Sequence, residues 1–182
     1  METIGYPPYR VVLLTPGRPY SAQIEMNRWE GTRWNACSGF IACDSAGRER
    51  LEIHLMPNVT LVTIKDPVGQ KLYTIDPANQ AFIERPYPPE MQMWRQDAVL
   101  PAGEKERQVI EGIESYRYDC PLRVEDGPTK WITDWMSNEV GLMAEEFVSS
   151  TGVKGSYKLH HIVLEEPAAD LFAVPEGLQR AE

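Results

Sequence analysis

Hydrophobic and polar residues alternate in short stretches along most of this 182-residue chain, and turn-forming residues separate the stretches. Residues 20–27 read Tyr-Ser-Ala-Gln-Ile-Glu-Met-Asn, and residues 51–55 read Leu-Glu-Ile-His-Leu. A period of two is typical of a β-strand with one buried face. The sequence therefore predicts a mainly β fold.

Two similar strand–turn units follow each other in the first half of the chain. Apolar stretches at residues 61–65 and 72–75 each run into an Asp-Pro pair, which begins at Asp66 and at Asp76. An Asp side chain can accept a hydrogen bond from the backbone two residues on, and Pro presets φ for a type I turn. The pattern predicts a β-meander that continues to about residue 85.

Strand patterns resume in the second half, and we expect about nine to eleven strands in total. The later stretches lie at residues 109–118, 130–136, 142–149 and 156–164. Spacings of this kind fit a sandwich, a barrel or a strongly curved open sheet. One short helix is predicted over Pro167–Phe172, because proline favours the first helical position and two glutamates precede it.

The length suits a single domain over residues 1–182, with a core at about residues 8–178. Residues 84–104 interrupt the strand pattern with several prolines, which do not fit a central strand. We expect this stretch to form a long loop or a short helical lid over the sheet. It contains Met91, Met93 and Trp94.

A formal net charge of −9 argues against binding to nucleic acid or to anionic membranes, both of which need Lys and Arg. No apolar run is long enough to span a bilayer. The first residues show no basic segment followed by an apolar core, so the sequence given carries no recognisable signal peptide.

The sequence shows no recognisable catalytic centre, metal site or cofactor motif. Gly-x-Ser-x-Gly, Cys-x-x-Cys and His-Glu-x-x-His are all absent. The adjacent His160 and His161 point to opposite faces of a regular strand, so they would share a metal only at a bulge. Among the cysteines, Cys37 and Cys43 would lie about 20 Å apart on one strand and could not bridge. Either could pair with Cys120, or all three are free buried thiols.

Tryptophan and methionine are the more suggestive residues. Trp131 and Trp135 are four residues apart and share one face of a regular strand. Together with Met91, Met93 and Trp94 they form ordinary core or line an apolar cavity. We predict these five residues as the ligand-binding set.

The order of several short segments resembles a known group of proteins. The segments are 17–22, 44–50, 64–67, 73–77, 110–113, 135–140, 166–167, 170–172 and 174–177. In order and spacing, over about residues 17–178, they resemble secreted bacterial proteins of the outer-membrane lipoprotein-sorting (LolA/LolB-like) superfamily.

The resemblance implies a half-barrel, a single curved antiparallel sheet around an apolar concave face with a loop or short-helix lid. Characterised members of the superfamily are extracytoplasmic, and they bind the acyl chains of lipoproteins or act as sensors of them. For this chain the resemblance implies a periplasmic or secreted location and an apolar small molecule or acyl chain as ligand. A related fold also occurs in a pigment-biosynthesis enzyme, so the fold does not fix the function.

Three functions therefore remain open. The first is binding of a lipid or another apolar ligand. The second is a hydrolase-like enzyme in the same cavity, with His54, His160 or His161 beside a carboxylate such as Asp134. The third is an envelope module that recruits a protein partner to a sheet edge.

Overall fold

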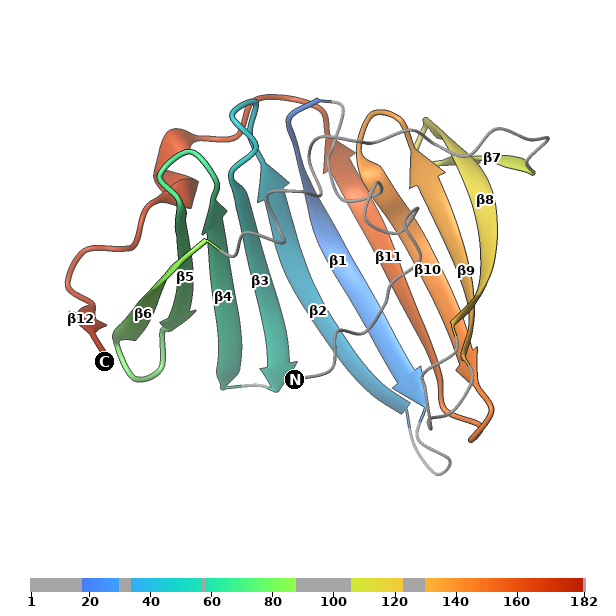
Figure 1. The fold of residues 1–182 in the computed structure, drawn as a ribbon, viewed down its shortest axis with the longest axis horizontal. Helices are drawn as coiled ribbons and strands as arrows, with labels where there is room; N and C mark the ends of the chain where they lie inside the picture. The colour runs from blue at the N-terminus through green and yellow to red at the C-terminus, as the bar shows by residue number, and fades with distance from the viewer. Residues whose placement is uncertain (1–17, 30–33, 57, 88–105, 123–129, 182) are drawn as a thin grey trace. The chain divides into compact units, whose positions relative to one another are not determined.

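The computed structural model describes residues 18–29, 34–56, 58–87, 106–122 and 130–181, and nearly all of its regular structure is β-strand (Figure 1). The elements are β1 (Tyr20–Trp29), β2 (Trp34–Cys43), β3 (Glu49–Met56), β4 (Val59–Asp66), β5 (Lys71–Asp76), β6 (Ala81–Pro86), β7 (Arg107–Ile110), β8 (Ile113–Leu122), β9 (Lys130–Ser137), β10 (Gly141–Ser149), β11 (Lys154–Val163), the 3₁₀ helix η1 (Ala169–Phe172) and β12 (Gln179–Arg180).

All the strands of the described residues belong to one hydrogen-bonded sheet. Their order is β12-β6-β5-β4-β3-β2-β1-β11-β10-β9-β8-β7, so the two ends of the sheet do not meet. Neighbouring strands pair in antiparallel fashion from β2 to β6 and from β7 to β11. The short β12 pairs in parallel with β6. The predicted mainly β fold with a single antiparallel sheet is confirmed, and the open sheet fits the half-barrel class.

The chain divides into two compact units. Unit 1 comprises residues 1–17, 26–36 and 94–158, and unit 2 comprises residues 18–25, 37–93 and 159–182. The boundaries pass through β1, β2 and β11, so each of these strands contributes to both units. The organisation of residues 1–182 as one domain stays a prediction. Most of the proposed lid, residues 88–104, lies outside the described residues.

Unit 2 has its core on one face of β2, β4 and β5. Ala42, Val62, Ile64 and Ile75 are almost completely buried there and pack with Phe172 from η1. Further apolar side chains of the C-terminal segment also pack against this cluster. The strands therefore use the C-terminal segment as their second layer, as a sheet face must be covered to exclude water.

Polar contacts fix the C-terminal segment to the strands of unit 2. Ser45 donates through its backbone N–H and its hydroxyl to the Glu166 carboxylate. Arg50 Nη1 donates to the carbonyl oxygen of Leu171 at 3.2 Å. The predicted helix is found in the right place, but it begins at Ala169 and has 3₁₀ geometry. Its backbone closes bonds between residues three apart, which suits a single short turn.

Both Asp-Pro turns form as predicted. Asp66 Oδ1 accepts from the backbone N–H of Gly69 at 2.8 Å, and Asp76 Oδ1 accepts from the backbone N–H of Asn79 at 3.1 Å. Each turn ends on a glutamine with positive φ, 55° at Gln70 and 49° at Gln80. This left-handed conformation is unfavourable for residues other than glycine, so both turns store backbone strain.

We expect Gln80→Gly to raise the free energy of unfolding by about 0.5 kcal/mol, because the relief of left-handed strain outweighs the entropy of the unfolded glycine. Gln80→Ala keeps the strain and brings no gain. Gly112 also has positive φ, and an added Cβ there meets no atom within 4 Å, so Gly112→Ala should cost about 1 kcal/mol through the backbone alone. Chemical denaturation measures all three. If Gln80→Gly is no more stable than Gln80→Ala, the left-handed conformation of Gln80 does not store strain.

Unit 1 is a second sheet region with its own buried face. On β9, Ile132, Asp134 and Met136 are almost completely buried, and they alternate with half-buried residues. A bulge between Leu142 and Ala144 interrupts the pairing of β10 with β9. It gives β10 an extra residue, Met143, which is also fully buried.

Candidate ligand-binding site

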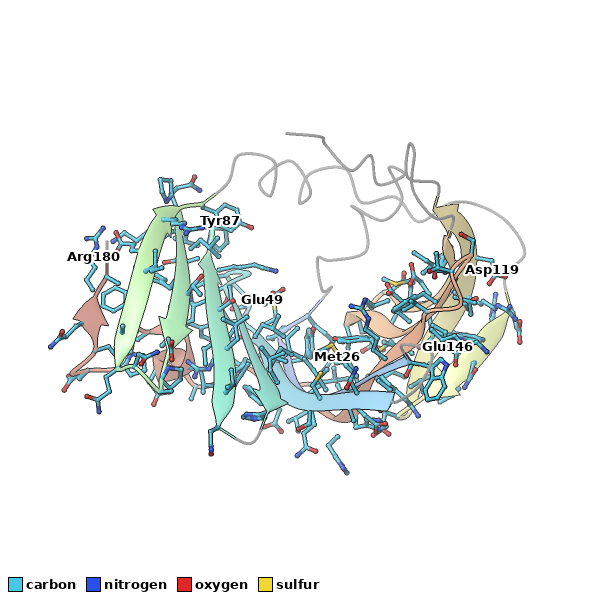
Figure 2. All side chains as sticks on the ribbon, turned by 90° about the horizontal axis from the view of Figure 1, so that it is seen from below. Met26, Glu49, Tyr87, Asp119, Glu146 and Arg180 are labelled. Carbon is cyan, nitrogen blue, oxygen red and sulfur yellow. The ribbon has the colours of Figure 1, made fainter. Side chains whose placement is uncertain are left out.

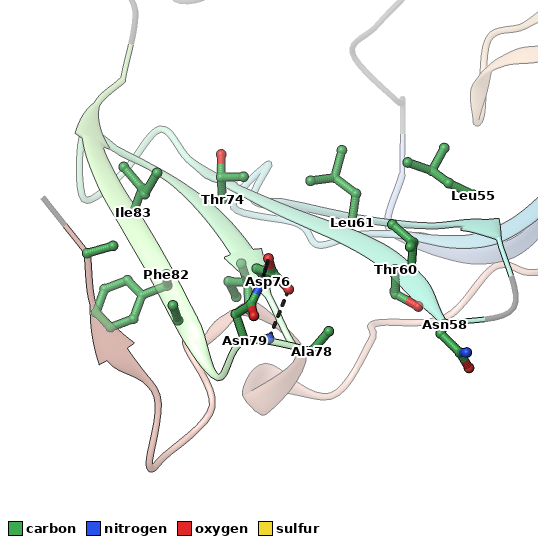
Figure 3. A pocket seen from close by; sticks show the side chains of 14 residues that line it. Leu55, Asn58, Thr60, Leu61, Thr74, Asp76, Ala78, Asn79, Phe82 and Ile83 are labelled. Carbon is green, nitrogen blue, oxygen red and sulfur yellow. Dashed lines mark hydrogen bonds between the residues drawn. The ribbon is translucent and has the colours of Figure 1, made fainter.

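The second face of unit 2 carries a row of apolar side chains that the C-terminal segment does not cover. Cross-strand pairs Ile53–Leu61, Thr63–Thr74 and Thr74–Ile83 place these residues on the same side of β3 to β6. We call this surface, defined by Leu51, Ile53, Leu55, Leu61, Thr63, Thr74 and Ile83, the apolar face. Four of its side chains point to the same side in Figure 3: Leu55, Leu61, Thr74 and Ile83.

Several large side chains at one end of the apolar face are exposed. Leu55 and Leu61 are 46% and 42% exposed, and the neighbouring Val59 is 39% exposed. On the opposite face of the same strand, Val62 is only 2% exposed. Adjacent aliphatic side chains that are exposed to water are typical of a surface that binds a ligand or a protein.

A pocket of about 610 Å³ opens at this end of the apolar face. It lies where β4 and β5 part, because their last pair is Val62–Ile75, while β5 and β6 stay paired to Asp76–Ala81 (Figure 3). Its size is within the roughly 300–1,000 Å³ of small-molecule sites. The lining residues are Leu55, Asn58, Val59, Thr60, Leu61, Thr74, Ile75, Asp76, Ala78, Asn79, Ala81, Phe82, Ile83 and Ala181.

The polar part of the pocket is uncharged except for one carboxylate. Asn79 donates to Asp76 from its side-chain amide at 2.7 Å and from its backbone N–H at 3.1 Å. These two hydrogen bonds, the side-chain bond first, lower the pKa of Asp76 below its ordinary value. The Asp76 carboxylate therefore stays negative under mildly acidic conditions.

At the opposite end of these strands, the same side of the sheet carries an ion pair. Lys65 Nζ lies 2.6 Å from Glu49 Oε1, and their side chains are 29% and 17% exposed. Burial alone would lower the pKa of Lys65, but the charge and hydrogen bond of Glu49 outweigh it and raise the pKa. Tyr87 and Cys43 also contribute to the rise, which places them nearby. Glu49 and Tyr87 are labelled in Figure 2.

We expect Glu49→Gln to lower the free energy of unfolding by about 1–2 kcal/mol near neutral pH, because Lys65 loses its anionic partner. The folded-state pKa of Lys65 is raised, so its contribution is complete below the unfolded-state value of 10.5 and is lost as pH rises through the folded-state pKa. The gap between the wild type and the variant should therefore narrow above about pH 10.5.

Denaturant unfolding at several pH values measures that gap. Glu106→Gln is the matched control, since Glu106 pairs with Arg117 at 2.9 Å but is 61% exposed. An exposed ion pair contributes little, so this variant should lose less than about 0.5 kcal/mol. Equal losses in the two variants would show that the Glu49–Lys65 pair has no special role in stability.

The structure leaves most of the sequence-predicted binding residues untested. Met91, Met93 and Trp94 lie outside the described residues, and for Trp131 only the position in β9 is described. Trp135 is half-buried on β9 and pairs across the sheet with Arg117. It belongs to unit 1, whereas the pocket belongs to unit 2.

Sequence reasoning missed the pocket residues of β3 to β6. A usable signal was present, because residues 59–64 read Val-Thr-Leu-Val-Thr-Ile, with aliphatic residues on both faces of one strand. Such a strand is typical of a sheet with two apolar surfaces.

His54 and His160 lie close to polar side chains of neighbouring residues. His54 Nδ1 lies 3.1 Å from Thr60 Oγ1, and its Nε2 lies 3.8 Å from Glu52. His160 Nε2 lies 3.5 Å from Glu25, and His161 has a φ of 51°. In the described ranges no three His, Cys, Asp or Glu side chains gather as metal ligands would, and neither Cys37 nor Cys43 forms a disulfide there. No helix there is long and apolar enough to cross a bilayer.

Comparisons with known proteins give a likeness of fold. No protein-family model and no curated protein matches the sequence. An uncharacterised conserved protein from Thermus thermophilus has a similar structure, with a TM-score of 0.60, 9% identity and 96% of each chain covered. MucB, solved in complex with MucA(peri), has a TM-score of 0.50 at 9% identity over 96% of this chain and 61% of MucB. A LolA superfamily protein from Nitrosomonas europaea has a TM-score of 0.45 at 8% identity, covering 95% and 99%.

The likeness is one of fold alone, since sequence identity is below 10% in all three. The structural neighbours include a protein of the LolA superfamily, the group that the order of sequence segments resembles. This chain spans about three fifths of MucB, so it corresponds to part of that protein.

Proposed function

We propose that this chain is an extracytoplasmic binding protein, periplasmic or secreted, for a lipid or another apolar ligand. The ligand lies against the apolar face of unit 2, with one of its ends in the pocket between β4 and β5. The exposure of Leu55, Val59 and Leu61 at the pocket is the observation that supports this most. Covering the exposed parts of these three side chains would contribute roughly 2–3 kcal/mol.

The proposal retains the ligand-binding residues predicted from the sequence, which are Met91, Met93, Trp94, Trp131 and Trp135. Methionine adapts its shape to irregular apolar ligands, and tryptophan adds a large apolar surface. In the proposal, the segment with Met91, Met93 and Trp94 covers the bound ligand. The ligand-binding role of Trp131 and Trp135 on β9 stays a prediction from the sequence.

An envelope protein partner is the second candidate. MucB, which has a similar fold, was solved in complex with MucA(peri). Among the described strands of this chain β7 pairs only with β8, so its second edge can accept a strand from another protein. Pull-down from an envelope extract that yields a protein partner and no small ligand would favour this candidate.

We expect Leu61→Asn to weaken binding of decyl maltoside about tenfold, because the variant loses apolar contact in the pocket. Its stability should change little, since Leu61 is already 42% exposed. Val68→Asn is the matched control, because Val68 is 70% exposed in the β4–β5 turn and does not line the pocket. Isothermal titration below the micelle concentration and tryptophan fluorescence measure the affinity.

Native mass spectrometry and lipid extraction of the purified chain test whether an amphiphile co-purifies with it. A co-purifying amphiphile supports the proposal. If no amphiphile co-purifies and decyl maltoside does not bind, the chain is not an apolar-ligand carrier. A hydrolase panel with His54→Ala, His160→Ala and His161→Ala variants tests the enzymatic alternative.

A further inference from the structure

The described residues that line the pocket at the end of the apolar face carry one negative charge and no positive charge. None of the fourteen residues that line it is Lys, Arg or His, and one, Asp76, is acidic. The other polar groups are the amides of Asn58 and Asn79 and the hydroxyls of Thr60 and Thr74. Among the described residues that line this pocket, an anionic group would find hydrogen-bond donors but no opposite charge.

The negative charge of Asp76 is fixed by the turn that follows it. Asp76 begins the Asp-Pro turn, and Asn79 holds both of its carboxylate oxygens with hydrogen bonds (Figure 3). These bonds hold the pKa of Asp76 below its ordinary value, so the charge persists when the surroundings become mildly acidic. The carboxylate is thus a stationary charge at the pocket and needs no rearrangement to meet a ligand.

Three basic side chains elsewhere in this part of unit 2 lie beside acidic groups. Lys65 pairs with Glu49 at 2.6 Å at the opposite end of β4. Lys71 and Arg180 lie 3.5 and 3.6 Å from the two oxygens of Glu84. Glu84 is shared by two cations and compensates only one of their charges, but none of Lys65, Lys71, Arg180 and the exposed Arg85 of β6 lines the pocket.

We propose that the pocket selects amphiphiles by the charge of the head group, and that it favours a cationic ammonium head over an anionic one. The inference rests on the proposed binding of an apolar chain and adds the class of ligand. The chain contacts Leu55, Leu61 and Ile83, and the ammonium group lies near Asp76. Carboxylate, sulfate and phosphate heads are disfavoured, because Asp76 repels them.

Three ligands with the same ten-carbon chain test the proposal on the whole 182-residue chain: decyltrimethylammonium, decyl maltoside and decyl sulfate, each below its micelle concentration. We expect affinity to fall in that order in titration calorimetry at low salt. The difference between the two charged ligands should shrink at high salt, because counter-ions screen an exposed charge.

The variant Asp76→Asn removes the charge and keeps an oxygen that can cap the turn. We expect it to weaken decyltrimethylammonium binding about three- to fivefold and to weaken decyl maltoside binding much less. A denaturant-unfolding transition close to that of the wild type shows that the variant folds. Glu176→Gln is the matched control, because Glu176 is exposed and lies outside the pocket lining. It should leave both affinities unchanged.

The outcomes separate this inference from the proposed function. If none of the three ligands binds, the proposed function itself fails. If maltoside binds but decyl sulfate binds as tightly as decyltrimethylammonium, the charge selection is wrong and apolar binding stands. Equal losses in Asp76→Asn and Glu176→Gln would mean that the acidic chain attracts cations without using the pocket, which also overturns the inference.

Discussion

The antiparallel register of β3, β4 and β5 is the constraint on which unit 2 depends. Both faces of β4 are apolar, with Val62 buried on one and Leu61 exposed on the other. A slip by one residue would exchange the two faces, because the side chains alternate with a period of two. The pairs Ile53–Leu61 and Val62–Ile75 hold the register in which Val62 packs toward Phe172 and Leu61 faces the pocket. Core and candidate site are therefore two results of the same hydrogen-bond pattern.

The strands and turns could be predicted from the sequence because their information is local. Alternation over residues 20–27 and 51–55 marks strands, and Asp66 and Asp76 indicate turns through the hydrogen bonds that their carboxylates accept. The covering of the sheet could not be predicted in this way. Phe172 packs against Ala42 and Val62, which are more than a hundred residues away in the chain, and no local pattern encodes that contact. The 3₁₀ geometry of η1 likewise depends on the packing around it.

The candidate site shows the same division between local and long-range information. Aromatic and methionine content pointed to an apolar cavity and to Met91, Met93, Trp94, Trp131 and Trp135. Of these five, only Trp135 has a described side chain, and it does not line the pocket of unit 2. That pocket exists because β4 and β5 stop pairing while each stays paired to its other neighbour. The point at which pairing stops is a property of three strands together, so the two-sided apolar pattern of residues 59–64 indicates the surface but not the hollow.

The parallel pairing of β12 protects the edge of β6 from pairing with other copies of the chain. Gln179 and Ala181 donate their backbone N–H groups to the carbonyl oxygens of Gln80 and Phe82, so this short segment occupies the outer edge of β6. An uncovered strand edge is a template for further strands and promotes aggregation. Residues 179–181 therefore cover the edge of β6 and prevent another strand from pairing there. Because they follow the other described strands in the sequence, they are synthesised after β6, whose edge is uncovered until then.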